Sequence, residues 1–268
     1  MGLIHFVGMS TEHDYTIGSA QYHWMEADLA SVNRTKTPWI VFGGHRAMYI
    51  NSNYVNGVTS DGVVMDNLIA NVEPLLWKYR VNLAFWGHNH VVQRHAAVLN
   101  KTVVQHSEQI YEEGSTAPTA YHDDPQATVH MVIGTAGAKF TVNYVEPYPE
   151  WCEMVFYRYG YARVQSISAS RLEWEWVSAL DGVVYDKMVI EQSTNFSKPW
   201  SIPEDENGKN SNNDDDNKLS SLEKGFIITA IIVVVGALSI VAFVIVTKYV
   251  VRKRHPPLAQ STHDPSSF

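Results

Sequence analysis

Cysteine is nearly absent from this sequence of 268 residues, and basic residues are outnumbered by acidic ones. Cys152 is the only cysteine, so no disulfide can form within the chain; we expect either a buried thiol or a partner cysteine outside this sequence. The formal net charge of -8 argues against a nucleic-acid partner, because such proteins present a basic face. Met1 to Val7 also lack the basic start and cleavage site of a signal peptide, so either a later hydrophobic helix acts as an uncleaved signal or residues before Met1 are missing, and we favour the second.

One long hydrophobic run stands out near the C-terminus. Phe226 to Thr247 contains no charged residue and, at about 1.5 Å per residue, is long enough as a helix to cross a hydrocarbon core of about 30 Å. The pattern predicts a single transmembrane helix over residues 225–251 that contacts the lipid bilayer. Residues 252–268 form a short basic tail, and residues 193–224 read as an acidic and polar stalk.

The charges around this run predict its orientation. Basic residues follow the helix and acidic residues precede it, and positive charge is retained on the cytoplasmic side. We therefore expect a single-pass type I membrane protein whose larger part is extracellular or luminal. Asn-x-Ser/Thr triplets on that side make Asn33, Asn100 and Asn195 candidate glycosylation sites.

Residues 1–192 alternate between strand and helix patterns, which indicates an α/β fold. The expected elements of the first part are strand 3–9, helix 18–33 with Ser19 as N-cap, strand 39–42, helix 63–79 interrupted or bent near Pro74, and strand 81–86. Residues 126–192 form a strand-rich segment, with expected strands at 128–133, 160–167, 171–177 and 183–190.

Two of the buried strands end directly before histidines. Trp39 to Gly44 leads into His45, and Leu83 to Gly87 leads into His88-Asn89-His90. In an open α/β sheet, ligands bind beyond the carboxyl ends of strands. Imidazole suits zinc, iron and manganese, so His45, His88 and His90 are candidate metal ligands, although a lone His-x-His is also common as a surface pair. The other histidines lack such a pattern and are interpreted as loop or core residues.

These segments resemble a known family. Val41-Phe42-Gly43-Gly44-His45 and Gly87-His88-Asn89-His90 are similar to two metal-ligand blocks of purple acid phosphatases and related calcineurin-like metallophosphoesterases, and Gly134-Thr135-Ala136-Gly137 is similar to a later segment. The resemblance implies that residues 1–192 are the C-terminal part of a four-layer α/β/β/α sandwich.

The same resemblance implies a chemistry. Iron and a second divalent ion (zinc, manganese or iron) would hold a phosphate-ester substrate for acid phosphatase hydrolysis of phosphomonoesters. His45 and His88 would bind the divalent ion and His90 the ferric ion. Arg46 and Arg94 would bind substrate phosphate or serve as structural ion-pair partners. No catalytic residue is assigned, and the oligomeric state is left open.

The family's three earlier motifs, Gly-Asp-x-Gly, Gly-Asp-x-x-Tyr and Gly-Asn-His, are not in this sequence. Three imidazoles without a bridging carboxylate do not hold two neighbouring cations against their repulsion. We therefore expect activity to need residues N-terminal to this chain. Two alternatives remain: a non-catalytic membrane-tethered ectodomain, and a mononuclear zinc hydrolase that uses His45, His88 and His90 with a water.

Overall fold

The computed structural model describes residues 2–56, 59–111 and 118–201. Most of the predicted stalk, the predicted transmembrane helix 225–251 and the basic tail 252–268 lie outside these residues. None of the helices in the described ranges has the length and apolar character needed to cross a bilayer.

A seven-stranded sheet carries the two histidine segments. Its order is β1 (Ile4–Gly8), β2 (Trp39–Gly44), β5 (Leu83–Trp86), β10 (Val129–Ile133), β6 (Val92–Leu99) and β11 (Cys152–Phe156), with β7 (Thr102–Gln105) paired to β6. The first four strands run parallel, and β6 and β11 run antiparallel to their neighbours. Runs such as Trp39 to Phe42 are buried along their whole length, as expected for strands covered on both faces.

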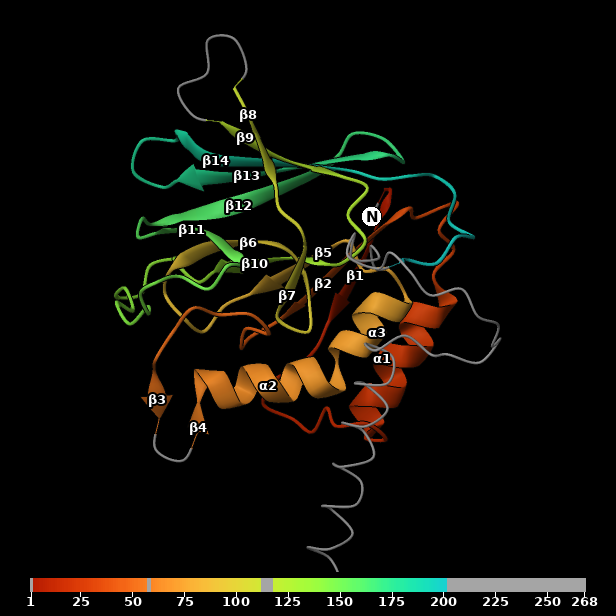
Figure 1. Ribbon diagram of the computed structural model, residues 1–268, viewed down its shortest axis with the longest axis horizontal. Helices are drawn as coiled ribbons and strands as arrows, with labels where there is room; N and C mark the ends of the chain where they lie inside the picture. The colour runs from red at the N-terminus through yellow and green to blue at the C-terminus, as the bar shows by residue number, and fades with distance from the viewer. Residues whose placement is uncertain (1, 57–58, 112–117, 202–268) are drawn as a thin grey trace, which may run out of the picture. The chain divides into compact units, whose positions relative to one another are not determined.

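Three helices cover one face of this sheet (Figure 1). They are α1 (Ala20–Ser31), α2 (Asp61–Asn71) and α3 (Glu73–Lys78). Ser19 caps α1 as predicted, because its side chain accepts a hydrogen bond from the Tyr22 backbone N–H. The helix predicted over residues 63–79 is interrupted near Pro74, one of the two predicted possibilities, and forms two helices because Pro74 has no backbone N–H to continue the ladder from α2 and lies in the first turn of α3.

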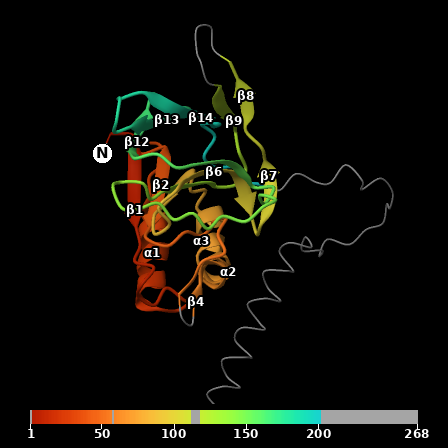
Figure 2. The same ribbon diagram turned by 90° about the vertical axis from the view of Figure 1, so that its left-hand side faces the viewer.

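A second sheet lies against the opposite face (Figures 1 and 2). Its order is β12 (Gly160–Ser166), β13 (Arg171–Ser178), β14 (Val184–Glu191), β9 (Thr119–Asp123) and β8 (Glu108–Ile110), and a separate two-stranded ribbon pairs β3 (Val55–Asn56) with β4 (Thr59–Ser60). Trp174 and Trp176 of β13 point inward and are fully buried. The described residues therefore form three layers, α/β/β, which is consistent with a part of the four-layer sandwich that the resemblance implies.

The predicted boundary at residue 193 is too early. Phe196 lies beneath the guanidinium groups of Arg34 and Arg80, with distances of 5.3 Å and 5.7 Å from their carbon atoms to the ring centroid. Arg80 also donates to the Phe196 carbonyl oxygen at 2.9 Å, and Trp200 is buried. Residues 193–201 thus pack on the domain, because two aromatic side chains in this polar segment find partners there.

Candidate metal centre

The pairing of β2 with β5 brings the two histidine segments together. The strands run parallel, with Gly44 opposite Trp86, so both chains leave the sheet at the same edge. The backbone N–H of Gly87 then donates to the carbonyl oxygen of His45 at 2.9 Å, which fixes the first residues of the two loops side by side. The convergence of His45 and His88, which the sequence predicts, is therefore a direct result of strand order.

The two imidazoles meet through one nitrogen each. His45 Nε2 lies 3.0 Å from His88 Nδ1, and the rings are nearly perpendicular, at 82°. Two imidazole nitrogens that each lie about 2.0–2.1 Å from one metal ion, at angles of about 90–110°, are separated by about 2.8–3.4 Å. The observed separation thus matches that of two ligands to a single cation.

His88 is held in an unusual backbone conformation. Its φ angle is 64°, in the left-handed region that residues with a side chain rarely adopt. Strain of this kind persists where the surroundings impose it, and it is concentrated at functional sites. Burial, followed by the nearby charge of Arg46, lowers the pKa of His88 and so favours the neutral ring that metal binding requires.

A buried carboxylate lies behind His88. Asp61, the first residue of α2, is 4% exposed and accepts hydrogen bonds from Ser52 Oγ at 2.5 Å and Asn89 Nδ2 at 2.8 Å. Its other oxygen, Oδ1, lies 3.9 Å from His88 Nε2. The sequence alone gives no signal for this residue, because an acidic residue in the first turn of a helix is commonplace.

His90 points elsewhere. Its Nδ1 lies 2.7 Å from the carbonyl oxygen of Lys139, and since a carbonyl can only accept, Nδ1 carries the proton. The backbone N–H of His90 donates to Thr141 Oγ1, and the Thr141 N–H donates back to the His90 carbonyl oxygen. This arrangement leaves Nε2 of His90 as the ring atom available to a ligand, and a backbone carbonyl is a typical partner for the far nitrogen of a metal-bound histidine.

Gly134 allows the histidine loop to lie this close to β10. A Cβ atom at residue 134 would stand 1.9 Å from the Asn89 carbonyl oxygen and 3.3 Å from the His90 Cα. The Gly134 N–H also donates to the Val91 carbonyl oxygen. The glycine is therefore required for close backbone approach, and its φ angle plays no part in this role.

The two candidate arginines occupy different environments. Arg46 Nε forms an ion pair with Glu12 at 3.0 Å, and the Glu12 side chain is 55% exposed. Arg94 is 2% exposed, and its guanidinium donates to Asp186 Oδ2 at 3.0 Å and to Glu153 Oε2 at 2.7 Å. This geometry favours the structural role for Arg94 and leaves Arg46, beside the histidines, as the better candidate for contact with substrate.

The donor set fits one half of a metal centre. Among the described residues, no three histidine, cysteine, aspartate or glutamate side chains converge in a way that could hold an ion, so His90 does not join His45 and His88 around one point. His45 and His88 could together offer two imidazole nitrogens to one cation. A bridging carboxylate, which a two-metal centre needs, is not contributed by the ranges that the structure describes.

The remaining predicted sites are placed as follows. Asn33, Asn100 and Asn195 are all exposed, which glycosylation requires. Cys152 is buried, and burial raises the pKa of its thiol to about 12, which is consistent with the buried-thiol alternative and makes the sulfur unreactive.

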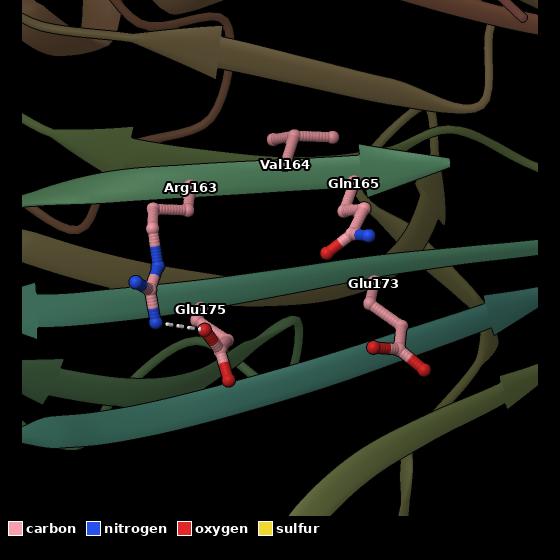
Figure 3. A pocket seen from close by; sticks show the side chains of 5 residues that line it. All are labelled: Arg163, Val164, Gln165, Glu173 and Glu175. Atoms are coloured by element: carbon pink, nitrogen blue, oxygen red, sulfur yellow. Dashed lines mark hydrogen bonds and ion pairs between the residues drawn. The ribbon is translucent and has the colours of Figure 1, made fainter. Parts of the chain in front are cut away.

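A groove of about 580 Å³ lies apart from the histidines, on the outer face of the second sheet. Arg163, Gln165, Glu173 and Glu175 line it, and Arg163 forms an ion pair with Glu175 at 2.5 Å (Figure 3). Side chains of both signs satisfy one another there, as on an ordinary solvated sheet face.

Several known proteins are similar to this chain in sequence. Residues 127–187 match the family described as iron/zinc purple acid phosphatase-like protein C. Over 201 residues, 71% of this chain, the sequence is 34% identical to "Probable inactive purple acid phosphatase 9" of Arabidopsis thaliana, of which it covers 27%. Over 175 residues, 65% of this chain, it is 30% identical to "Purple acid phosphatase 18" of the same plant, of which it covers 34%.

A solved structure agrees in fold. The purple acid phosphatase isolated from yellow lupin (Lupinus luteus) seeds superposes with a TM-score of 0.60 at 26% identity, covering 72% of this chain and 32% of that one. The chain thus spans about a third of the length of the relatives it matches.

Proposed function

We propose that this chain, which belongs to the purple acid phosphatase family as its C-terminal portion, supplies the divalent-ion half of a two-metal phosphomonoesterase centre. The observation that carries the proposal is the 3.0 Å separation of His45 Nε2 and His88 Nδ1 at the end of two adjacent parallel strands. Residues N-terminal to this chain would supply the bridging carboxylate and the rest of the ligands.

Each residue has a defined part in this proposal. His45 and His88 bind the divalent ion (zinc, manganese or iron), and His90 offers Nε2 to the ferric ion. Bound cations supply Lewis-acid stabilisation of the phosphate ester. Arg46 orients the substrate phosphate from the rim of the site, exchanging its exposed partner Glu12 for the phosphate oxygens.

The proposal also includes the location of the domain relative to a membrane. The domain lies on the extracellular or luminal side of a membrane, anchored through residues 225–251, and acts on phosphate esters there. A strongly acidic chain in that setting is not expected to bind nucleic acid.

A zinc titration of the full chain tests the proposal. We expect one zinc ion per chain, with the affinity lowered at least about 100-fold in His45→Ala and in His88→Ala, because each removes one of two protein ligands. His23→Ala is the matched control, since His23 is exposed on α1. Unchanged zinc binding in both ligand variants would exclude the site. Phosphatase activity is then assayed on this chain beside an N-terminally extended version, and we expect activity only in the longer protein.

A second candidate function is a non-catalytic ectodomain. It is supported by the incomplete ligand set of the described residues and by the word "inactive" in the name of one relative. It predicts no phosphatase activity in the extended protein. The mononuclear zinc hydrolase is disfavoured, because it needs three imidazoles around one ion and His90 does not meet the other two within the described ranges.

A further inference from the structure

We infer that Asp61 is a positioning residue of the metal centre: it sets the orientation and the tautomer of His88 and anchors the loop that carries both His88 and His90. This inference rests on the proposed function for its purpose, but its geometry stands in the protein without metal.

The carboxylate of Asp61 is buried and faces three groups. Ser52 Oγ and Asn89 Nδ2 both donate to Oδ2, while Oδ1 is directed towards His88 Nε2 at 3.9 Å. The side chain is 4% exposed, and among the described residues no lysine or arginine forms an ion pair with it. A buried carboxylate without a cationic partner is costly, which indicates that its position serves something other than stability.

The direction of Oδ1 determines which nitrogen of His88 carries the proton. At 3.9 Å the Oδ1 atom is too distant for a hydrogen bond, but its charge attracts an N–H, so we place the proton of His88 on Nε2 and the lone pair on Nδ1, which faces His45. Nδ1 is therefore the metal-binding atom. In the metal-free protein His45 Nε2 would then donate to His88 Nδ1, and binding of a cation by both nitrogens would require the proton of His45 to move to its Nδ1.

The contact with Asn89 holds the loop itself. Asn89 is buried and stands between His88 and His90 in the sequence. Its side chain donates a hydrogen bond to Asp61 of α2, and its backbone carbonyl lies close to Gly134, which follows β10. These two contacts fix the peptide that follows His88. Without them, the φ angle of His88, 64°, would be expected to return to a more common value. Removing the carboxylate is expected to loosen the loop as well as the ring.

Asp61→Asn tests the inference with little change of shape. The oxygen of the new amide is held towards Ser52 and Asn89, which both donate, so its NH₂ group faces His88 and clashes with an Nε2 proton. We expect His88 to shift to the Nδ1-protonated tautomer and zinc affinity to fall about 10–100-fold. Asp66→Asn is the matched control, since Asp66 lies on the same helix but is 61% exposed and paired with Lys101; we expect a change below about 2-fold there.

Two readouts separate this inference from the proposed function. Long-range ¹H–¹⁵N correlation spectra of the metal-free protein at about pH 8, above the usual histidine pKa of about 6.5, report the tautomer of His88 directly. An Nδ1-protonated His88 in the unmodified protein overturns the inference even if Asp61→Asn does not fold. Zinc binding that is equal in Asp61→Asn and the unmodified protein overturns it too, and leaves the proposed function intact. Failure of His45→Ala and His88→Ala to alter zinc binding removes the proposed function, while the tautomer still tests Asp61.

Discussion

Ionisable side chains lie both at the loop edge of the seven-stranded sheet and in the interior between the two sheets. The two groups of side chains differ in the partners that they bond to. Between the sheets, Arg94 of β6 bonds to Asp186 of β14 and Glu153 of β11, so a cation and two carboxylates complete one another. At the loop edge, His45 and His88 bond only to each other among the described side chains, and the carboxylate of Asp61 lies beside them without a cation.

This difference separates stability from function. The interior cluster is largely enclosed, and Arg94 forms an ion pair with each of its two carboxylates, as expected for a network that holds two sheets together. The edge cluster holds two imidazoles in one hydrogen bond and keeps His88 in a strained backbone conformation, a combination typical of functional sites. Substitutions in the two regions should therefore affect different measurements.

Arg94→Met is expected to have the largest effect, a loss of about 3–5 kcal/mol in the free energy of unfolding, because it leaves the buried carboxylate of Asp186 without its cation and removes one partner of Glu153. Urea denaturation of the full chain measures this. Arg163→Met is the control, since its ion pair lies on the exposed sheet face. A loss below about 1 kcal/mol for Arg94→Met would show that the buried cluster does not hold the sheets together.

Gly134→Ala should have an intermediate effect and lower both the free energy of unfolding and the zinc affinity. The new methyl group would overlap the Asn89 carbonyl oxygen, so the histidine loop must move, at a cost of about 1–3 kcal/mol. We also expect zinc affinity to fall at least about 10-fold as His88 is displaced. Gly8→Ala is the matched control, because no atom lies within 4 Å of a Cβ there. Normal zinc binding in Gly134→Ala would argue that loop position is not critical.

The smallest effect at neutral pH is expected for His122→Phe, which should stabilise the protein by about 1 kcal/mol. His122 is fully buried, and neither ring nitrogen has a hydrogen-bond partner among the described residues, so the substitution removes two unsatisfied polar atoms. Thermal or urea unfolding measures the gain. His23→Phe, an exposed control, should change the free energy of unfolding by less than about 0.5 kcal/mol.

The gain from His122→Phe should grow as the pH falls. Burial lowers the pKa of His122 to about 4 and of His95 to about 3, against about 6.5 in an unfolded chain. The unfolded chain therefore takes up these protons first, and the stability present above about pH 6.5 is lost as the pH falls towards 3–4. Glu73 acts oppositely: burial raises its pKa to about 7, so its contribution is present below about pH 4.5 and is lost as the pH rises to about 7. An unchanged acid slope in His122→Phe would contradict this account.

Much of the fold follows from local patterns. The strands that precede His45 and His88, the cap at Ser19 and the strands β12, β13 and β14 of the second sheet are found where the sequence predicts them, whereas β8 and β9 are not predicted. The sequence does not reveal β6, since Val92 to Leu99 is buried throughout yet contains Gln93, Arg94 and His95. Polar residues can line a buried strand only when distant partners satisfy them, and such partners are invisible to periodicity.

The candidate site divides in the same way. His45 and His88 could be predicted to meet, because parallel neighbouring strands end at one edge and their glycines lead straight into the histidines. Two contacts could not be predicted: the hydrogen bond between His90 and the Lys139 carbonyl oxygen, and the ion pair between Arg94 and Asp186. In each case the partner lies far away in the chain, at 49 and 92 residues.

The sequence by itself therefore determined which strands end in metal-binding side chains, because strand length, glycine placement and residue chemistry are local properties. Only the tertiary structure decided which nitrogen of each ring faces its neighbour, which carboxylate stands behind His88 and which arginine remains accessible. Those choices depend on contacts between segments far apart in the chain, and packing sets them one pair at a time.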